Sequence, residues 1–266
     1  MGVNYTKSDS KITKLNAPEQ AVGVDGLFLL RENTEFGSMF GRSFVTDLET
    51  MALQLPAGRT IADYVVNRDG VVVRADALGT VNEAAIIKVD DKGVATYEKI
   101  GNQNADFRVG LTSNFSYKNF DFYMLWDIKE GGDIYNRNGQ WTTISERNAI
   151  VDQAGFPEQE KKTVNYYATL YDTNSSNKFW VEDGSYVKLK ETSLTYTLND
   201  KLLGENSFFD SIKLSLIGRN LLTFTDYLGW DPEIANYDAA TQQYFSVDYG
   251  VYPNQKSYSF SVQLKF

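Results

Sequence analysis

The C-terminal segment KSYSFSVQLKF, residues 256–266, alternates between apolar and polar side chains. Each even-numbered residue from Tyr258 to Phe266 is apolar, and each odd-numbered residue from Ser257 to Lys265 is polar. A period of two indicates a β-strand with one apolar and one polar face. Such a strand extends ~26 Å at ~3.3 Å per residue, and at a tilt of ~40° it covers most of an apolar band ~25 Å tall. We therefore predict a membrane-spanning strand with an aromatic residue at each interface.

The same alternation occurs on both sides of Lys118 and Asn119. One parity carries the apolar residues before this dipeptide, and the opposite parity carries those after it: Phe107, Val109, Leu111, Phe115 and Tyr117, then Phe120, Phe122, Met124, Trp126 and Ile128. Two such runs joined by two polar residues predict a hairpin in which Asn119 supplies the positive φ of a tight turn. Further strands are predicted within residues 194–198 and 212–216.

The connections between these strands alternate between short and long. The links at residues 118–119 and 199–210 are short, whereas those at 130–185 and 223–255 are long and rich in Asn, Asp, Gly and Tyr. Bacterial barrels alternate short periplasmic turns with long external loops. If Phe266 lies at the periplasmic side, both long connections are external. The sequence therefore predicts an all-β fold, an antiparallel transmembrane β-barrel segment with long extracellular loops.

The chain divides into three regions on these grounds. Candidate strands at residues 26–31 and 36–45 assign the first region to the barrel. The second holds short β-like pieces between turn signals, is neither low-complexity nor Pro-rich, and is assigned to an elaborated extracellular loop region. The regions are residues 1–45, barrel strands; 46–105, loop region; and 106–266, C-terminal barrel strands with the external loops 130–185 and 223–255.

Composition excludes several kinds of chemistry. The 266 residues include no Cys and no His, which rules out disulfides, Cys nucleophiles, His-based acid–base pairs and zinc clusters. A formal charge of −9 argues against nucleic acid as a partner. Aromatic residues make up 14%, which suits strands and the girdles of a membrane barrel. No apolar run approaches the ~18 residues that a membrane helix needs.

The N-terminal sequence has no features of a secretory signal peptide, since Met1 is followed by Gly2, Val3, Asn4 and Tyr5. A barrel protein must cross the inner membrane to reach its site. We therefore expect the chain to be a piece of a longer one, or its start to lie elsewhere.

Three carboxylate pairs have the residue types of a glycosidase acid and base: Asp231/Glu233, Asp90/Asp91 and Glu182/Asp183. Each lies in a predicted loop, where acidic residues usually face solvent or shape turns. The stretches around Gly70 and Gly93 lack the ligand spacing of a calcium loop. We assign no catalytic residue, no metal ligand and no cofactor.

An ordered series of short motifs resembles the C-terminal third of the SusC/RagA family of TonB-linked outer-membrane receptors. Order and spacing agree over residues 100–266 and more weakly over 20–45. Gln103 and Ala105 depart from the family pattern, and the insertion at 46–100 fits a subgroup. The motifs are Ile100-Gly101-Asn102, Asp106-Phe107, Tyr117-Lys118-Asn119-Phe120-Asp121, Gly132-Asp133-Ile134-Tyr135-Asn136, Tyr186-Val187-Lys188-Leu189-Lys190, Gly218-Arg219-Asn220-Leu221-Leu222-Thr223, Asp231-Pro232-Glu233, Asp248-Tyr249-Gly250, Tyr252-Pro253 and the terminal Phe266.

The resemblance implies a barrel of about 22 strands with a plug in its lumen, of which this chain supplies the C-terminal part. It also implies an outer-membrane location and import of an oligosaccharide, a peptide or a similar bulky nutrient. The implied partners are outer-membrane lipid, a SusD-like surface lipoprotein, the TonB system through an N-terminal part outside this chain, and the barrel-assembly machinery, for which Phe266 would be the signal.

Six aromatic residues of the external loops are candidate contacts for a ligand or for the lid protein. Their rings are suited to stacking on sugars or other ligands that enter the barrel. Alternatively, they pack the loops together or contact the lid. The six are Trp141, Tyr166, Tyr167, Trp180, Tyr227 and Trp230.

Two other classes of protein stay open at this point, a soluble or surface-attached β-sandwich that binds glycans and a small stand-alone outer-membrane barrel. Solubility without detergent favours the sandwich. Detergent-dependent folding with heat-modifiable gel mobility favours a barrel, and covalent continuity with a plug favours the receptor.

The alternation predicts that Phe122, Met124, Trp126, Val262 and Leu264 contact lipid. We expect Leu264→Arg to cost ~2–4 kcal/mol near the bilayer midplane, because it places a charge in hydrocarbon. Ser261→Arg on the polar face is the matched control. Heat-modifiable gel mobility measures assembly, and equal assembly of the two variants would contradict the assignment of faces.

Overall fold

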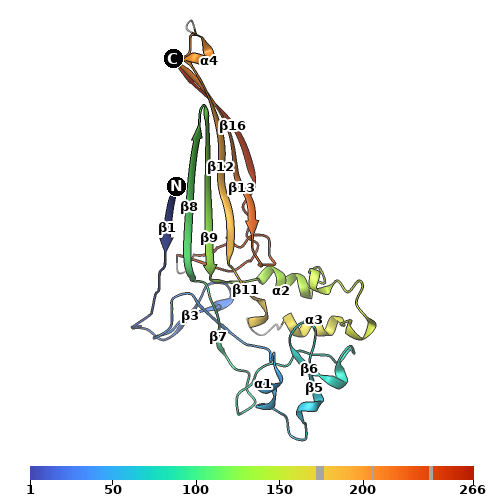
Figure 1. Cartoon of the computed structure of the whole chain (residues 1–266). Helices are drawn as coiled ribbons and strands as arrows, with labels where there is room; N and C mark the ends of the chain where they lie inside the picture. Colours follow the sequence, from blue (N-terminus) through green and yellow to red (C-terminus); the bar gives the residue numbers. More distant parts are fainter. Residues whose placement is uncertain (172–176, 205–206, 240–241) are drawn as a thin grey trace.

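The chain consists of a tall antiparallel sheet joined to a domain built from its long connections (Figure 1). The computed structural model describes residues 1–171, 177–204, 207–239 and 242–266. The sheet has six strands in the order β1-β8-β9-β12-β13-β16, and we call it the wall. Within the described residues, no helix has the length and apolar character needed to cross a membrane.

The wall comprises β1 (Gly2–Thr6), β8 (Ala105–Tyr117), β9 (Phe120–Gly131), β12 (Tyr186–Asn199), β13 (Ser211–Phe224) and β16 (Ser257–Lys265). The other strands are β2 (Gln20–Val22), β3 (Phe28–Leu30), β4 (Ser38–Gly41), β5 (Tyr64–Val66), β6 (Val72–Arg74), β7 (Glu98–Asn102), β10 (Asp133–Tyr135), β11 (Val181–Asp183), β14 (Asn236–Asp238) and β15 (Gln243–Phe245). The helices are α1 (Leu48–Ala52), α2 (Arg137–Ile144), α3 (Val164–Tyr171) and α4 (Asp200–Leu203).

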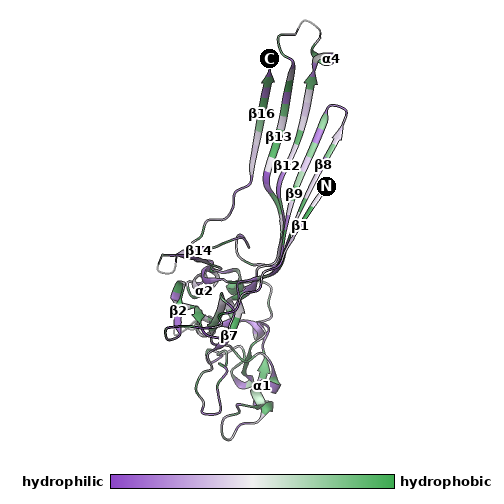
Figure 2. Cartoon of the chain, turned by 90° about the vertical axis from the view of Figure 1, so that its left-hand side faces the viewer, coloured by the Kyte–Doolittle hydropathy of each residue, from purple (hydrophilic) through white to green (hydrophobic). Residues whose placement is uncertain are grey.

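The register of the wall gathers apolar residues on one face and polar residues on the other. Residues directly opposite each other on neighbouring strands share a face. One apolar row across five strands is Phe115, Phe122, Leu194, Leu216 and Phe260. The adjacent polar row is Ser116, Asp121, Thr195, Ser215 and Ser261. We call these the outward and inward faces; Figure 2 shows the alternation along the strands.

The predicted hairpin at residues 118–119 is confirmed, since Tyr117 pairs with Phe120. The positive φ of 54° belongs to Lys118, however, and not to Asn119 as expected. Asn119 is held by the neighbouring strand: its side-chain Nδ2 donates to the Thr197 carbonyl at 2.6 Å, and its carbonyl accepts from the Thr197 amide at 2.8 Å. These two bonds fix the Asn119 backbone, so the left-handed residue is the one before it.

Residues 1–45 contribute one strand to the wall, β1, which pairs with β8. The expected strands at 26–31 and 36–45 form as β3 and β4, but they lie in the separate sheet β2-β3-β4-β7. Their assignment to the barrel is therefore wrong. Phe28 and Met39 are 1% and 0% exposed, and all four residues of β4 are buried. Such strands lack the polar face that a wall strand needs, so they pack inside the domain.

The connections form a domain with its own core, which we call the loop domain (the described residues within 7–104, 132–185 and 225–256). Its main cluster joins residues far apart in the sequence, among them Phe28, Val73, Tyr166, Trp180 and Phe245. A smaller cluster of Val45, Met51, Tyr64 and Val72 holds α1 against the β5–β6 hairpin. The 46–105 segment is thus packed against the other connections.

Glycines mark the passage from the wall to the loop domain. After β9, Gly131 and Gly132 have φ of 70° and 79°, a region that favours glycine. Before β12, the Gly184 amide donates to the Gly132 carbonyl at 3.1 Å. A Cβ on Gly184 would lie 2.3 Å from that carbonyl oxygen, so no larger residue fits there. The β10–β11 pair begins next to the wall, where Gly132 and Gly184 lie close together.

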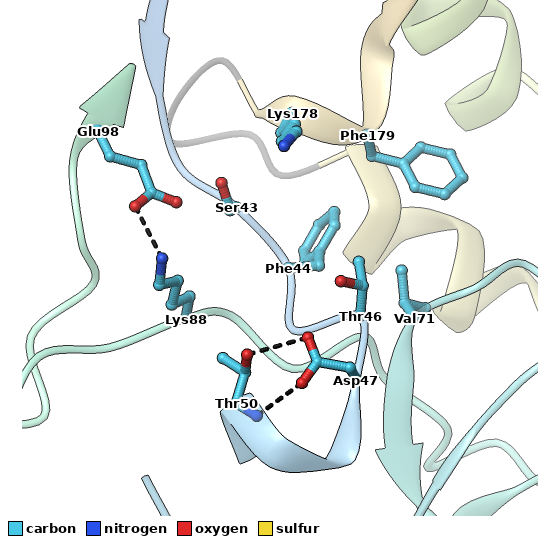
Figure 3. A pocket seen from close by; sticks show the side chains of 10 residues that line it. All are labelled: Ser43, Phe44, Thr46, Asp47, Thr50, Val71, Lys88, Glu98, Lys178 and Phe179. Atoms are coloured by element: carbon cyan, nitrogen blue, oxygen red, sulfur yellow. Dashed lines mark hydrogen bonds and ion pairs between the residues drawn. The ribbon is translucent and has the colours of Figure 1, made fainter. Parts of the chain in front are cut away.

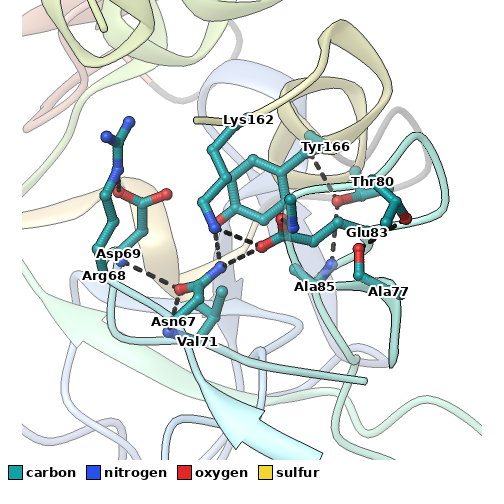
Figure 4. Close-up of polar contacts among 12 residues, drawn as sticks. Asn67, Arg68, Asp69, Val71, Ala77, Thr80, Glu83, Ala85, Lys162 and Tyr166 are labelled. Atoms are coloured by element: carbon teal, nitrogen blue, oxygen red, sulfur yellow. Dashed lines mark hydrogen bonds and ion pairs between the residues drawn. The ribbon is translucent and has the colours of Figure 1, made fainter. Parts of the chain in front are cut away.

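A buried ion pair connects the 46–105 segment to the connection between β9 and β12 (Figure 4). Lys162 Nζ lies 2.6 Å from Glu83 Oε1, and the two side chains are 1% and 0% exposed. The other Glu83 oxygen accepts from the Gly79 amide at 2.8 Å. Asn67 donates to Glu83 at 3.1 Å and to the Tyr166 hydroxyl at 2.8 Å. The buried Glu83 carboxylate therefore accepts hydrogen bonds from three donors, as a buried ion pair requires.

Lys162→Met should destabilise the loop domain by ~3–5 kcal/mol, because the Glu83 carboxylate would remain buried without its cation. The adjacent Lys161→Met is the control, since the Lys161–Glu158 pair is 40% and 81% exposed. An exposed pair contributes ~0–1 kcal/mol at most. Hydrogen–deuterium exchange of the β5–β6 hairpin measures the difference. Equal exchange in the two variants would contradict a structural role for the Lys162–Glu83 pair.

Candidate functional site

Four charged side chains meet on the inward face at the end of the wall next to the loop domain. Lys188 of β12 contacts Asp231 and lies 3.0 Å from Glu233 Oε2, and Lys190 also contacts Glu233. The side chains of Lys188 and Asp231 are 2% and 6% exposed. We call these four residues the latch, because they join β12 to the last long connection.

A β-bulge in β12 makes the latch compatible with the apolar outward face. Leu189 pairs with Trp126 and Glu191 pairs with Leu125, so Lys190 is an extra residue on β12. A bulge of this kind reverses the alternation of faces along the strand. Even-numbered Lys188 therefore faces inward before the bulge, while even-numbered residues beyond it, such as Leu194, face outward.

Two backbone amides donate further hydrogen bonds to the Asp231 carboxylate. Its Oδ1 accepts from the Glu233 amide at 3.0 Å and its Oδ2 from the Asn254 amide at 2.8 Å. Burial alone raises the pKa of the Asp231 carboxyl, but the bonds to Lys188 and to the two amides outweigh burial and hold the pKa below its usual value. The expectation was that these acidic residues, Asp231 and Glu233, face solvent or shape turns. Asp231 is buried, shapes the local turn through the Glu233 amide, and joins Asn254 to Lys188 on the wall.

Three further polar side chains of the inward face lie beside the latch. The Tyr186 hydroxyl donates to Asp127 Oδ2 at 2.9 Å, and the Arg108 guanidinium lies 3.4 Å from the same hydroxyl. Asp127 is opposite Lys188 in the register of β9 and β12. The inward face therefore carries charges of both signs here, with Arg108 opposite Lys129 and Asp127 opposite Lys188.

A second contact joins the two long connections to each other. The Tyr227 hydroxyl donates to Asp248 Oδ2 at 2.7 Å, and Asn138 donates to Asp248 Oδ1 at 2.6 Å. Burial and the adjacent Asp248 carboxylate raise the pKa of Tyr227. The phenol therefore stays protonated and keeps donating to Asp248. The Asn138 side chain, on α2, bonds to the other oxygen of Asp248 and holds α2 close to the last connection.

The six candidate aromatic residues fall into two groups. Tyr166, Tyr167, Trp180 and Tyr227 are between 0% and 5% exposed and pack the loops together. Their rings are not open to a ligand or a lid in this structure. Trp141 and Trp230 are 44% and 79% exposed, and they remain candidates for contact. In irregular loops, buried and exposed residues do not recur at a fixed sequence spacing. The sequence therefore offers no means of separating the two groups.

A cavity of about 370 Å³ lies in the loop domain between the segment before α1 and the residues that precede β11 (Figure 3). Its charged side chains largely satisfy each other. Lys88 Nζ lies 2.8 Å from Glu98 Oε2, and Asp47 caps α1 by accepting from the Thr50 amide at 2.7 Å. Phe44 and Phe179 form its apolar side.

The terminal Phe266 packs against the rings of Phe208 and Phe209, with centroid distances of 5.5 Å to each. It is 71% exposed.

In the part of the chain that the structure describes, no group of three or more Asp and Glu residues is arranged to hold a metal ion.

No family model matches the chain. Similar curated proteins include three TonB-dependent receptors of Formosa agariphila. Receptor P3 is 32% identical over 171 residues, which are 63% of this chain and 17% of the receptor. Receptor P39 is 22% identical over 296 residues, with 99% and 28% coverage, and receptor P26 is 28% identical over 213 residues, with 75% and 20%. The chain thus spans less than a third of the length of these relatives.

Solved structures of the RagAB peptide importer match the fold over 99% of this chain. The closed-closed state has a TM-score of 0.64 at 17% identity, and the open-open state 0.61 at 18%. The matches cover 27% and 26% of those chains. The predicted resemblance to SusC/RagA-type TonB-dependent receptors and the predicted barrel-segment fold are both confirmed.

Lys188→Met should release the last connection from the wall, because it leaves the Asp231 carboxylate buried without a cation, at a cost of ~3–5 kcal/mol. Arg219→Met is the control, since the Arg219–Glu191 pair is 49% and 33% exposed. Protease cleavage within residues 231–254 measures the release.

The wild-type latch should also respond to pH. The pKa of Asp231 is lowered in the folded state, so its contribution is complete above the unfolded value of ~3.9 and is lost as the pH falls through the folded pKa. Cleavage within residues 231–254 should therefore be slow at neutral pH and accelerate below pH ~4. Cleavage that is independent of pH would contradict this contribution.

Proposed function

We propose that this relative of the TonB-dependent receptors supplies the C-terminal barrel wall and external loops of an outer-membrane transporter that imports a bulky nutrient, an oligosaccharide or a peptide. The main support is the wall itself, whose six antiparallel strands separate an apolar from a polar face and match the RagA-type fold over 99% of the chain. A soluble sandwich would bury its apolar face, whereas Phe115, Leu216 and Phe260 are 58%, 62% and 64% exposed.

The inward face would line the lumen through which cargo passes. Ser, Thr and Asp side chains across the wall offer hydrogen bonds to sugar hydroxyls or peptide groups, as in the row that ends at Ser215 and Ser261. The latch holds the last connection against this face near the loop domain. In the proposed mechanism, cargo binds at the external loops and TonB then rearranges a plug contributed by another part of the receptor.

The wall also has two edges, β1 and β16, each paired on one side. A strand edge in hydrocarbon leaves backbone N–H and C=O groups without partners, at several kcal/mol each. Closure by further strands of a larger barrel satisfies these groups. Phe266 would serve the barrel-assembly machinery, exposed at the end of β16 opposite the loop domain (Figure 1).

Exposed apolar residues of the last connection suit a protein lid of the SusD type. Leu228, Trp230 and Tyr252 are 86%, 79% and 93% exposed. Trp and Tyr are enriched at the centres of protein interfaces. Trp141 contributes a further exposed ring, packed edge-on against Tyr249 at a centroid distance of 5.2 Å.

Uptake by cells of the source organism tests the transport proposal. Deletion of the gene should abolish uptake of one labelled cargo class, short peptides or oligosaccharides, and the intact gene should restore it. Uptake of both classes at the level of the parent strain would contradict the proposal. Release of the protein from membranes without detergent would favour the β-sandwich instead.

Trp230→Ala should weaken binding of the lid lipoprotein by ~2 kcal/mol if this ring is an interface anchor. Leu53→Ala is the control, because Leu53 is 88% exposed but is the C-cap of α1, which lies at the opposite end of the loop domain from β14 (Figure 2). Copurification of the lipoprotein with the membrane-extracted protein is the measurement. An equal loss in both variants, or none in either, would remove Trp230 from the interface.

A further inference from the structure

The motif Gly218-Arg219-Asn220-Leu221 builds an irregularity on the outward face of β13. Asn220 has a φ of 52°, and its side chain donates to the Gln255 carbonyl at 3.2 Å. Leu221 covers Gly218, which is buried, and a Cβ on Gly218 would lie 2.6 Å from Leu221 Cδ1. Glycine at 218 therefore lets Leu221 lie flat against the strand.

A groove of about 460 Å³ lies beside this irregularity. Its floor is the row formed by Thr192, Gly218 and Tyr258, in which Gly218 has no side chain and Thr192 a small one. The next row, Phe122, Leu194, Leu216 and Phe260, forms a continuous apolar side, and Leu221 forms part of the other. The volume lies in the ~300–1,000 Å³ range of ligand pockets.

Most of the surface of the groove is apolar, and its polar side chains are hydroxyls. None of the side chains that line it is charged. The Thr192 hydroxyl donates to the Tyr123 carbonyl at 3.0 Å, so its polar atom is satisfied by the wall. The Leu194, Leu216 and Phe260 side chains are 42%, 62% and 64% exposed, and they belong to the outward face. This face is in contact with the bilayer in a transmembrane barrel, so hydrocarbon is the medium that reaches the groove.

The polar end of the groove also fits a lipid. Tyr258 is 77% exposed at the start of β16, where tyrosine belongs to the interfacial girdle of a barrel. Lys256, which is exposed, comes two residues earlier, at the side of the loop domain. A lipid with its acyl chain along Leu216 and Phe260 would place its phosphate near the Lys256 ammonium.

We propose that this groove is a binding site for one acyl chain of a phosphate-bearing membrane lipid, with the head group at Tyr258 and Lys256. The site goes beyond the transport proposal, since it depends on the orientation of the wall and not on the cargo. A bound lipid here fills the space beside Gly218 and supports the irregular part of β13 next to the latch-bearing strand β12.

Photolabelling tests the site directly. The membrane-extracted protein is reconstituted into phosphatidylcholine vesicles with a small fraction of phosphatidylglycerol that carries a diazirine in one acyl chain. Mass spectrometry then maps the labelled residues. We expect labels to concentrate on the groove, at Leu194, Leu216 and Leu221, over Val109 and Leu264 of the same face. Even labelling of the whole outward face would overturn the proposal without the need for any variant.

Two variants sharpen the test. Thr192→Phe fills the groove and should abolish the excess labelling there, whereas Leu214→Phe on the same face, outside the groove, should leave it unchanged. Heat-modifiable gel mobility verifies that both variants assemble. Lys256→Gln should reduce groove labelling by the phosphatidylglycerol probe. Excess labelling that survives Thr192→Phe would overturn the acyl-chain site, and labelling insensitive to Lys256→Gln would overturn the head-group assignment.

Discussion

Hydrogen bonding between neighbouring strands of the wall limits where every other part of this fold can lie. In hydrocarbon, backbone groups have no water to bind, so each strand must pair along its whole length with its neighbours. The four strand pairs from β8 to β16 do this over long, nearly unbroken registers, and β1 pairs with β8 over Gly2–Thr6. Each side chain then points to one of two faces of the sheet. The apolar and polar rows follow from this, and an irregularity is needed wherever the alternation has to reverse.

The irregularities lie where the wall meets the loop domain. The bulge at Lys190 and the left-handed Asn220 lie close together on adjacent strands. Leu189 pairs with Leu222 on the loop-domain side of both irregularities. The bulge at Lys190 places the lysines of the latch on the inward face. The left-handed Asn220 shapes the groove on the outward face. Strand bulges cluster at barrel rims for this kind of reason, since they re-aim side chains where regular pairing ends.

The wall was predictable from the sequence and most of the loop domain was not. Alternation is local, so Tyr258 to Phe266 and the hairpin around Lys118 could be assigned from neighbouring residues alone. The β3 and β4 segments are short apolar runs, which fit a wall strand or a buried strand equally well. Their place was decided by partners such as Phe245, more than 200 residues away in the sequence.

The candidate site shows the same division. Both halves of the latch stood in recognised motifs, but their pairing depends on a bulge that brings Lys188 opposite a connection 43 residues further along. Of the six loop aromatics, burial separated four from Trp141 and Trp230, and burial in irregular segments has no sequence period. The left-handed residue of the tight turn was displaced by one position because Asn119 is bonded to β12, a contact between distant parts of the chain.

The extra residue in β12 also determines which length changes the wall can accept. Removing Lys190 would make β12 regular against β9 and leave Leu189 and Thr192 on the same face as before. Removing a residue elsewhere in the strand, for instance Thr195, would invert one half of β12 and carry leucines into the lumen or lysines into the lipid. Among homologous proteins, single-residue gaps in this strand should therefore fall at position 190, where the bulge lies.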